Sequence, residues 1–502
     1  MHGEIGFDSS KYVEEQTRYI LERVQASSGR LYIECGGKLL HDKHASRVLP
    51  GFDENNKMKV FQSLKDKLDI IICIYAGDIE RRKIRSDFGI SYDADVLRMI
   101  DDFAAYGIKC DKVVITRYEN QVAASVFKDK LERRGINVYT HPRTPGYPAN
   151  IDVVVSENGY GKNEYIPVNA PVVIVTAPGP GSGKLATCLS QMYHEAKMGM
   201  KPSYSKLETF PIWNLPLDHP VNVAYEAATA DIGDVNLIDH FHLNAYGKIT
   251  VNYSRDLEAY PLLARILEKI TGEPCVYKSP TDMGVNRCGF GIIDDEICRK
   301  AGRDEIIRRY FQIRTDYVSG LADEETVNRI SAIMDKMGLK ESDRVVVEPS
   351  RKALEKARAE GKGKNGTVCA AAIELPDGRI VTGHNSDMLH ACSALLLNAL
   401  KVMTGIPEER DLISSKVIKS ITAMKRDILS GRGVSMNLDE ILIALAMSAS
   451  ETEDARKAIE ALPLLKNAEV HLTHVPSPGD SSGLRKLGLL YTSDPEYPGR
   501  NI

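Results

Sequence analysis

The sequence predicts an α/β protein with several domains, and three observations lead to that class. The chain has 502 residues, and at about 150 residues per domain this length suggests roughly three domains. Apolar residues make up 43% and charged residues 27%, as in ordinary globular proteins. Before residue 180, short runs rich in valine and isoleucine alternate with amphipathic segments. This alternation is typical of a mostly parallel sheet covered by helices on both faces.

Six runs in this first region are short, apolar and β-branched, which predicts strands. They lie at 31–35, 68–76, 111–118, 136–141, 151–157 and 171–178. Three amphipathic segments between them, at 56–68, 93–107 and 120–135, predict helices because apolar residues recur there at spacings of three and four. We therefore predict a three-layer α/β domain over residues 1–230.

The pattern changes after residue 230. Residues 231–345 are predicted to form an α+β and helical middle region, with a helical element at 295–340. A third, α/β unit is expected over 346–502. In it, the basic stretch 350–366 predicts an exposed helix leading into a flexible turn. Two β-rich runs joined at Asp377-Gly378 then predict a hairpin, and an apolar helix follows at 388–405.

Charge and hydropathy exclude several classes of function. The formal charge of −4 lacks the basic excess of a protein dedicated to duplex nucleic acid. No apolar run reaches the length of a membrane span, and the first residues lack the features of a signal peptide. We expect a cytoplasmic protein without nucleic-acid or membrane partners, either monomeric or a homo-oligomer. The nine cysteines never show CxxC spacing, so we expect reduced thiols and no zinc or other metal site.

The window 171–197 is the most informative chemically. An apolar strand runs into the glycine-rich turn APGPGSGK, and a helical pattern starts at once. In a phosphate-binding loop, the glycines allow close approach of the backbone, the helix N-terminus adds its dipole, and a lysine adds charge. Here the match to GxxxxGK[ST] is incomplete, because Pro178 replaces the first glycine and Leu185 replaces the hydroxyl residue that would bind magnesium. A Rossmann-like or P-loop-like domain is expected, although a simple strand-to-helix connection with a solvated lysine fits the same residues.

Other polar residues extend this candidate site. Loops at the carboxyl ends of parallel strands bind ligands in open α/β sheets, so cations in 36–51 and 76–93 are candidates for an anion pocket. In 231–239 and 277–289, aspartates suit metal or base chemistry, although helix capping explains them equally well. The candidate binding residues are Gly179, Gly181, Ser182, Gly183, Lys184, Lys38, Arg47 and Arg85, with Lys83 and Asp87 beside them. The candidate catalytic residues are Asp231 and Asp282.

Two functions of different classes follow from these residues. The first is an enzyme, such as a phosphotransferase, that binds a nucleotide or another phosphorylated small molecule at 179–184. ATP with Mg²⁺ is its cofactor candidate, although the sequence fixes no cofactor. The second is a noncatalytic sensor or assembly protein that binds a metabolite. We expect the loops 36–51, 76–93, 179–184 and 277–289 to converge on one cleft.

Long motifs show a resemblance to a known family. The chain resembles the bacterial uncharacterised protein family 0371, which is also domain-of-unknown-function family 1846, from about residue 4 to the last ten residues. The motifs are HASRVLPGF (44–52), TAPGPGSGK (176–184), ETFPIWNLPL (208–217), HPVNVAYEAATAD (219–231), VNYSRDLEAYP (251–261) and SPTDMGVN (279–286). The resemblance implies no established activity. The family pattern has methionine at position 185, so the resemblance implies that the missing Ser/Thr at Leu185 is a feature of the family. Ser493-Asp494-Pro495 departs from the family pattern, which has Cys-Glu-Pro there.

The third unit is also similar in layout to cytidine deaminases, since a strand hairpin is followed by a helix that begins near Asp387. Zinc deaminases need an HxE motif on that helix and a PCxxC motif beyond it. His384-Asn385-Ser386 and the unpaired Cys392 depart from both motifs. This resemblance therefore implies a scaffold without the zinc chemistry.

Overall fold

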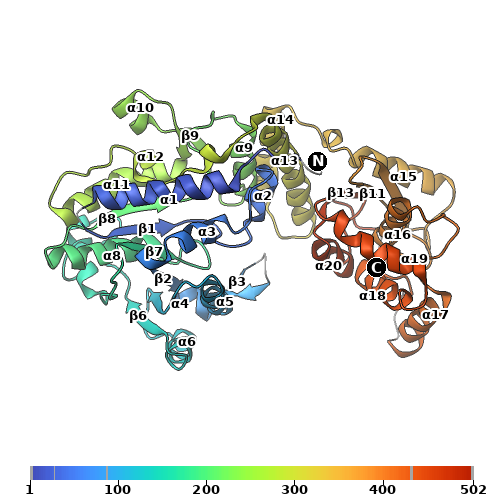
Figure 1. Ribbon diagram of the computed structural model, residues 1–502, viewed down its shortest axis with the longest axis horizontal. Coiled ribbons are helices and arrows are strands. Elements are labelled where there is room, and N and C mark those ends of the chain that lie inside the picture. The colour runs from blue at the N-terminus through green and yellow to red at the C-terminus, as the bar shows by residue number, and fades with distance from the viewer. Residues whose placement is uncertain (1–3, 28, 86–88, 430–433, 499–502) are drawn as a thin grey trace. The chain divides into compact units, whose positions relative to one another are not determined.

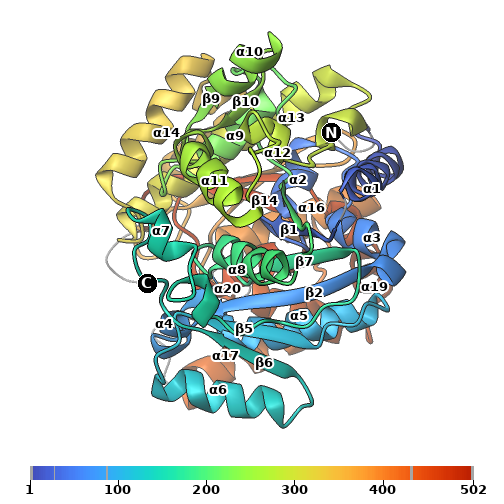
Figure 2. The ribbon, with the colours of Figure 1, turned by 90° about the vertical axis from the view of Figure 1, so that its left-hand side faces the viewer.

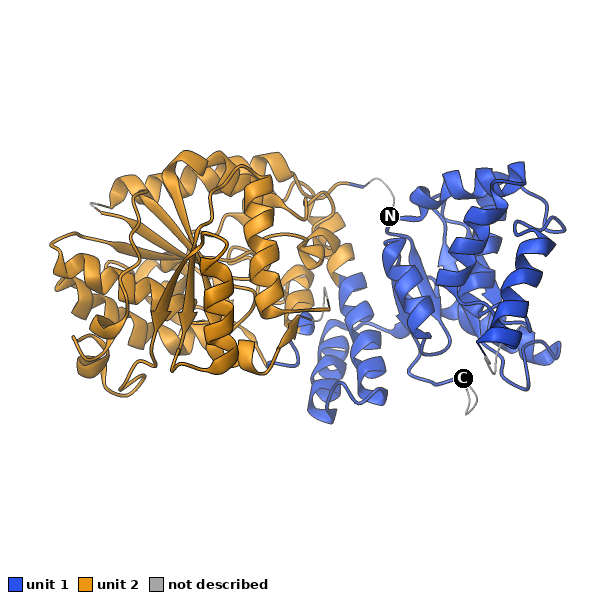
Figure 3. Ribbon diagram, turned by 90° about the horizontal axis from the view of Figure 1, so that it is seen from below, with its two compact units in different colours: residues 1–4, 227–232, 303–502 blue, residues 5–226, 233–302 orange. Residues whose placement is uncertain are grey.

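The computed structural model describes residues 4–27, 29–85, 89–429 and 434–498. They form two compact units, shown in different colours in Figure 3. The N-terminal unit comprises residues 5–226 and 233–302, and the C-terminal unit comprises residues 1–4, 227–232 and 303–502. Asp87 lies outside the described residues. Within the described ranges, every helix is too short or too polar to cross a bilayer.

A parallel sheet of six strands forms the centre of the N-terminal unit (Figure 1). Its strands lie in the order β6-β5-β2-β7-β1-β8, and every neighbouring pair is parallel. Their bounds are β1 Leu31–Cys35, β2 Leu68–Tyr75, β5 Lys112–Thr116, β6 Asn137–His141, β7 Val172–Thr176 and β8 Ser203–Leu207. The predicted α/β class is therefore confirmed.

Helices cover both faces of this sheet. Figure 2 shows α8 on one face and α3 and α5 on the other. On the α8 face, Tyr32, Val173 and Val175 pack in one core cluster with Cys188 and Leu189 of α8. The main helices are α1 Ser9–Ala26, α3 Asn56–Ser63, α5 Tyr92–Ala105, α6 Val122–Glu132, α8 Lys184–Lys197 and α11 Ser254–Thr271. Because β7 is buried at every residue, it is the apolar centre of the unit.

Shorter elements complete the N-terminal unit. The helices are α2 Lys43–Val48, α4 Ala76–Glu80, α7 Ile151–Val154, α9 Pro220–Ala228, α10 His240–Tyr246 and α12 Pro280–Met283. The strands are β3 Ile84–Arg85 and β4 Ile90–Ser91, which pair with each other, and β9 Asn236–Ile238 and β10 Val251–Tyr253, which also pair.

Two sheet predictions differ from the structure. The expected strand 151–157 is wrong, because Asn150 caps a single helical turn there by accepting a hydrogen bond from the Val153 N–H. Conversely, β8 was not predicted. Its sequence, SYSKL, lacks an apolar run. It is an edge strand that pairs with β1 and makes one further bridge, from Lys206 to Gly284. These backbone hydrogen bonds do not require apolar side chains.

The C-terminal unit contains a mixed sheet in the order β12-β11-β13-β14. β11 is antiparallel to both of its neighbours, while β13 and β14 are parallel. The strands are β11 Ala370–Glu374, β12 Ile380–His384, β13 Glu469–Leu472 and β14 Leu490–Ser493. The predicted hairpin at Asp377-Gly378 is confirmed, and Gly378 adopts a φ of +83°, which a glycine accepts without strain.

The helices of the C-terminal unit are α14 Glu324–Met337, α15 Val347–Ala359, α16 Ala391–Thr404, α17 Ser415–Ala423, α18 Leu438–Ser448, α19 Glu453–Ala461 and α20 Pro478–Lys486. Of these, α15, α16 and α20 contact the second sheet directly. α13 (Asp295–Val318) spans the boundary near residue 302. The predicted helical element at 295–340 and the long helix after the hairpin are confirmed. One core cluster joins α16, α18 and α19 to the sheet.

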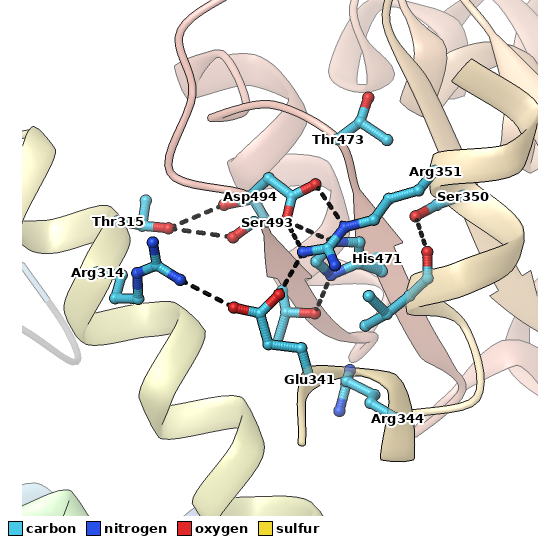
Figure 4. Close-up of polar contacts among 12 residues, drawn as sticks. Arg314, Thr315, Glu341, Arg344, Ser350, Arg351, His471, Thr473, Ser493 and Asp494 are labelled. Carbon is cyan, nitrogen blue, oxygen red and sulfur yellow. Dashed lines mark hydrogen bonds and ion pairs between the residues drawn. The ribbon is translucent and has the colours of Figure 1, made fainter. Parts of the chain in front are cut away.

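A network of ion pairs lies at the carboxyl ends of β13 and β14 (Figure 4). The Arg351 guanidinium binds Asp494 at 2.6 Å and Glu341 at 2.6 Å, and Glu341 also pairs with Arg314. Burial opposes ionisation of Asp494, but His471 and Arg351 hold the pKa of that carboxyl at about 2. Asp494, one of the residues that departs from the family pattern, therefore fixes the last strand of the chain.

The C-terminal core gives a test of this packing. Leu445 of α18 has no exposed surface, whereas Leu464 is 61% exposed. Leu445→Ala should lower the free energy of unfolding of this unit by about 2–5 kcal/mol, because it removes buried methyl groups and leaves a cavity. The exposed Leu464→Ala should change the free energy by less than about 0.5 kcal/mol. Calorimetric unfolding of the two variants tests the difference, and similar melting curves would contradict this core.

Candidate functional site

The glycine-rich loop leaves the sheet at a point where its connections diverge. After β2 the chain proceeds to β5 on one side, whereas after β7 it crosses β1 to reach β8 on the other. Such a reversal is the topological switch point at which open α/β sheets bind ligands, outside the carboxyl ends of their strands. The loop of residues 177–183 joins the end of β7 to the start of α8 and therefore occupies that position.

Neighbouring side chains fix the shape of this loop. The Thr116 hydroxyl donates to the Ser182 carbonyl at 2.8 Å, and the Ser182 hydroxyl donates to the Gly179 carbonyl at 3.0 Å. Gly183 caps α8 with a φ of +92°, and a Cβ there would lie 2.9 Å from Thr116. Gly179 is closely packed against Tyr92. Only glycine fits the space and the backbone at 183.

The loop presents unused hydrogen-bond donors at the start of α8. Thr187 N–H is the first amide that bonds back, to the Gly183 carbonyl at 3.0 Å. Among the described residues, no acceptor takes the N–H groups of Lys184, Leu185 or Ala186. Free amides and the helix dipole at one place favour an anion.

Two cations flank the loop. The Lys184 ammonium has no carboxylate within ion-pair distance in the part of the chain that is described. Arg117, just after β5, stacks on Tyr75 at 3.5 Å and donates to the Gly181 carbonyl. Arg117 also has a positive φ of 51°, which is uncommon for a non-glycine residue. The sequence analysis missed this residue, although its place directly after a parallel strand was the available signal.

The other predicted cations have different surroundings. Lys38 and Arg85 line one small cavity together with Ala177, which precedes the loop. Arg85 pairs there with the buried Asp95 at 2.7 Å, so an internal carboxylate already balances its charge. Arg47 lies in the last turn of α2. Lys83 lies 4.8 Å from the ring centre of Tyr92. Lys38 and Arg85 are thus brought to the same sheet edge as the loop.

The two predicted catalytic aspartates are not brought to the loop by any contact in the described residues. Asp282 lies in the first turn of α12, and its carboxylate accepts hydrogen bonds from the Tyr246 hydroxyl at 3.0 Å and from the Lys278 N–H at 3.1 Å. Asp231 is exposed and belongs to the C-terminal unit. The contacts of Asp282 support the helix-capping explanation.

Contacts connect the predicted loops along one edge of the sheet. Loops 36–51 and 76–93 share the cavity at Ala177. The first of them also packs against Glu208 through Gly36, and the Glu208 N–H donates to Asn286 of loop 277–289 at 2.7 Å. A continuous series of contacts therefore runs from β2 and β7 to β8.

Charged groups also surround the end of β1. Glu34 accepts a hydrogen bond from Tyr204 at 2.8 Å, and the next residue is the buried Cys35. Burial raises the pKa of the Cys35 thiol to about 11, and the negative charges of Glu208 and Glu34 act in the same direction. The positive charges of Lys57 and Lys184 act to lower this pKa. These four charged side chains therefore lie around one thiol.

The fold and this loop define an α/β protein with a glycine-rich turn at the switch point of a parallel sheet. The model described as domain of unknown function DUF1846, N-terminal, matches residues 5–338, and the C-terminal model matches residues 342–502. The chain belongs to this family, as the sequence motifs indicated.

Similar proteins extend over the same length. A UPF0371 protein of Fusobacterium nucleatum subsp. nucleatum is 55% identical over 501 residues, and one of Clostridium tetani is 54% identical over 498 residues. A UPF0371 protein of Clostridium botulinum (strain Alaska E43 / Type E3) is 53% identical over 498 residues. In each case 99% of both chains is covered. None of these names states an activity.

The close packing at Gly183 can be tested with a matched pair of glycines. Gly183 and Gly199 flank α8 with φ values of +92° and +80°, but a Cβ meets Thr116 only at Gly183 and nothing within 4 Å at Gly199. Both alanine variants have the cost of a left-handed conformation, about 1–2 kcal/mol. Gly183→Ala should lose about 1–3 kcal/mol more, because of overpacking.

The chain has one tryptophan, Trp213, which lies in the N-terminal unit. Urea unfolding followed by its fluorescence measures both glycine variants. Equal loss of stability in the two would show that Thr116 does not constrain the loop.

Proposed function

We propose that this protein binds the phosphate group of a nucleotide or another phosphorylated small molecule at residues 179–184. The observation that carries the proposal is the set of free amides at the start of α8, beside Lys184 and at the switch point of the sheet. The backbone of Gly181, Ser182 and Gly183 would cradle the phosphate oxygens, and Lys184 would neutralise their charge. This assignment makes the N-terminal unit a P-loop-like variant of the parallel α/β fold.

A phosphotransferase is the enzyme class that this arrangement suits best. Phosphoryl transfer depends mainly on positioning and on charge stabilisation, and the loop, Lys184 and Arg117 would provide both. The Arg117 guanidinium donates a hydrogen bond to the carbonyl of Gly181, which is part of the loop. A guanidinium at that place would stabilise the negative charge that develops on a transferred phosphoryl group.

Leu185 favours a second candidate, a noncatalytic metabolite-binding protein. It stands where a P-loop has the hydroxyl that binds magnesium, so the loop alone supports binding better than turnover. Prolonged incubation with each bound ligand, followed by mass spectrometry, separates the two candidates. A converted product identifies an enzyme, and ligand recovered unchanged identifies a binding protein.

Lys184 gives the direct test of phosphate binding. We expect Lys184→Ala to weaken binding of the phosphorylated ligand by about 10-fold to 100-fold, because a hydrogen bond to a charged group contributes about 1.5–3 kcal/mol. Calorimetric titration with ATP, GTP and simple phosphorylated metabolites measures the change. Lys197→Ala is the matched control, since Lys197 lies at the other end of α8 and is 62% exposed.

Either of two results would contradict the proposal. One is that none of these phosphorylated compounds binds to the wild-type protein. The other is that Lys184→Ala binds them as tightly as Lys197→Ala does.

We also infer that the C-terminal unit is a deaminase-like scaffold without zinc chemistry. Its hairpin is followed by α16, which begins after His390, and β13 is followed by α20, which begins after Ser477. Zinc deaminases place HxE and PCxxC at such helix starts. Here His390 and Ser477 bond directly to the buried Asp480, at 2.8 and 2.7 Å. Polar side chains at the two helix starts thus bond to one another, which supports a scaffold without zinc chemistry.

Metal analysis tests this inference. Protein purified without a histidine tag should contain far less than one zinc per chain, because the side chains at both helix starts bond to one another. Dialysis against a chelator should leave the melting temperature of the wild-type protein unchanged. One tightly held zinc per chain, with a melting temperature that falls on chelation, would refute the scaffold assignment.

A further inference from the structure

Glu34 lies beside the proposed phosphate site but has an unused oxygen. It stands at the end of β1, the strand next to β7, where it pairs in register with Val175. Its Oε2 accepts a hydrogen bond from Tyr204, whereas Oε1 has no donor among the described residues. Val175 packs in one cluster with Cys188 of α8, the helix that begins with Lys184, so Glu34 lies on the face of the sheet that α8 covers.

The surroundings of Glu34 contain more carboxylates than one ammonium can balance. The Lys206 ammonium pairs with Glu208 at 3.1 Å and with Asp256 at 2.6 Å. Burial opposes the charged form of Lys206, but Glu208, Asp256 and Glu34 together raise its pKa. Glu34 stands opposite Lys206 in the register of β1 and β8, so a third carboxylate lies near an ammonium that already pairs with two.

Independent features at the same strand ends point to a ligand. Lys57 is 3% exposed, yet its ammonium donates only to the Gly36 carbonyl, at 3.0 Å, and meets no carboxylate within the described ranges. A buried charge without a counter-ion is costly. The hydroxyls of Thr176, at the end of β7, and Thr209, after β8, are also buried without a partner in the described part of the chain.

Glycines allow close packing at this point. A Cβ at Gly36 would collide with the Glu208 carboxylate, and one at Gly37 would lie 3.2 Å from the Lys57 ammonium. Gly37 also has a φ of +66°, which disfavours side chains. The turn thus passes closely between the Glu208 carboxylate and the Lys57 ammonium.

These charges restrict the class of ligand. A bare phosphate on the loop would be repelled by Glu34 and Glu208, because like charges close together raise each other's energy. A divalent cation between phosphate and carboxylates removes that repulsion. Mg²⁺ is usually held by one or two carboxylates plus phosphate oxygens. This matches a protein in which, among the described residues, no three His, Cys, Asp or Glu side chains form a complete metal site.

We propose, on the basis of the phosphate-binding function above, that the ligand is a di- or triphosphate bound as its complex with a divalent cation. Glu34 and Glu208 hold the cation, and the loop 179–184 holds the phosphates. Lys57 balances charge beneath the Gly36-Gly37 turn. The carboxylates of β1 and β8 thereby supply the metal ligand that Leu185 cannot provide.

Calorimetric titration with ATP, in EDTA or with Mn²⁺, tests the proposal on the full chain. We expect the wild-type protein to bind ATP at least 10-fold more tightly with Mn²⁺ than in EDTA. Glu34→Gln should lose this enhancement. In EDTA it should bind ATP as tightly as the wild-type protein or more tightly, since a repelling charge has been removed. Glu157→Gln is the matched control, because Glu157 lies at the far end of α8, where it pairs with Lys197.

The outcomes separate this proposal from the proposed function. If Mn²⁺ leaves ATP affinity unchanged, or if Glu34→Gln keeps the enhancement, the metal proposal is overturned while phosphate binding stands. If neither ATP nor inorganic tripolyphosphate binds under any condition, phosphate binding itself fails.

A measurement on the wild-type protein covers the case in which Glu34→Gln does not fold. Fe²⁺ in place of Mn²⁺, with ATP, ascorbate and peroxide, cleaves the backbone next to the bound metal. Cuts near residues 34–37, 181–184 and 208 support the proposal. Cuts confined to other segments, or independent of ATP, overturn it.

Discussion

The N-terminal unit depends on one constraint, the complete burial of β7 between β1 and β2. A strand buried on both faces carries mainly apolar side chains, here four apolar residues before Thr176, and the chain leaves the sheet at the carboxyl end of the strand. The connections after β2 and β7 leave toward opposite sides of the sheet. The chain after β7 turns within seven residues into α8. Close packing against Thr116 and Tyr92 then requires glycine at the turn. Within the described part of the chain, the same turn leaves the first amides of α8 without acceptors.

Charge along the edge of the sheet follows from this geometry. Parallel strands end at the same edge, so residues far apart in the sequence meet there. Arg117 comes from the end of β5, Glu34 from β1 and Glu208 from just after β8. Buried carboxylates such as Asp95 neutralise some of the cations, while Lys184 and Lys57 have no such partner within the described residues. The contrast separates charges that are balanced within the fold from charges without an internal partner among the described residues.

The C-terminal unit contains polar networks whose members bond to one another. Asp480 accepts hydrogen bonds from His390, from Ser477 and from the Leu438 N–H at 2.9 Å. Arg351 likewise joins Glu341 to Asp494. A buried network whose members bond internally stabilises the packing and leaves few groups for chemistry.

The sequence by itself determined the apolar strands, the amphipathic helices, the hairpin at Asp377-Gly378 and the position of the glycine loop, because periodicity and turn chemistry are local. Its motifs also identified the family. It missed β8, whose polar residues carry no strand pattern, and it wrongly made 151–157 a strand, because one cap at Asn150 outweighs β-branched composition. Only the tertiary structure decided which charges meet. Strand order brings Arg117 to the loop and Glu34 beside β7. That order arises from packing between distant segments, which no local pattern encodes.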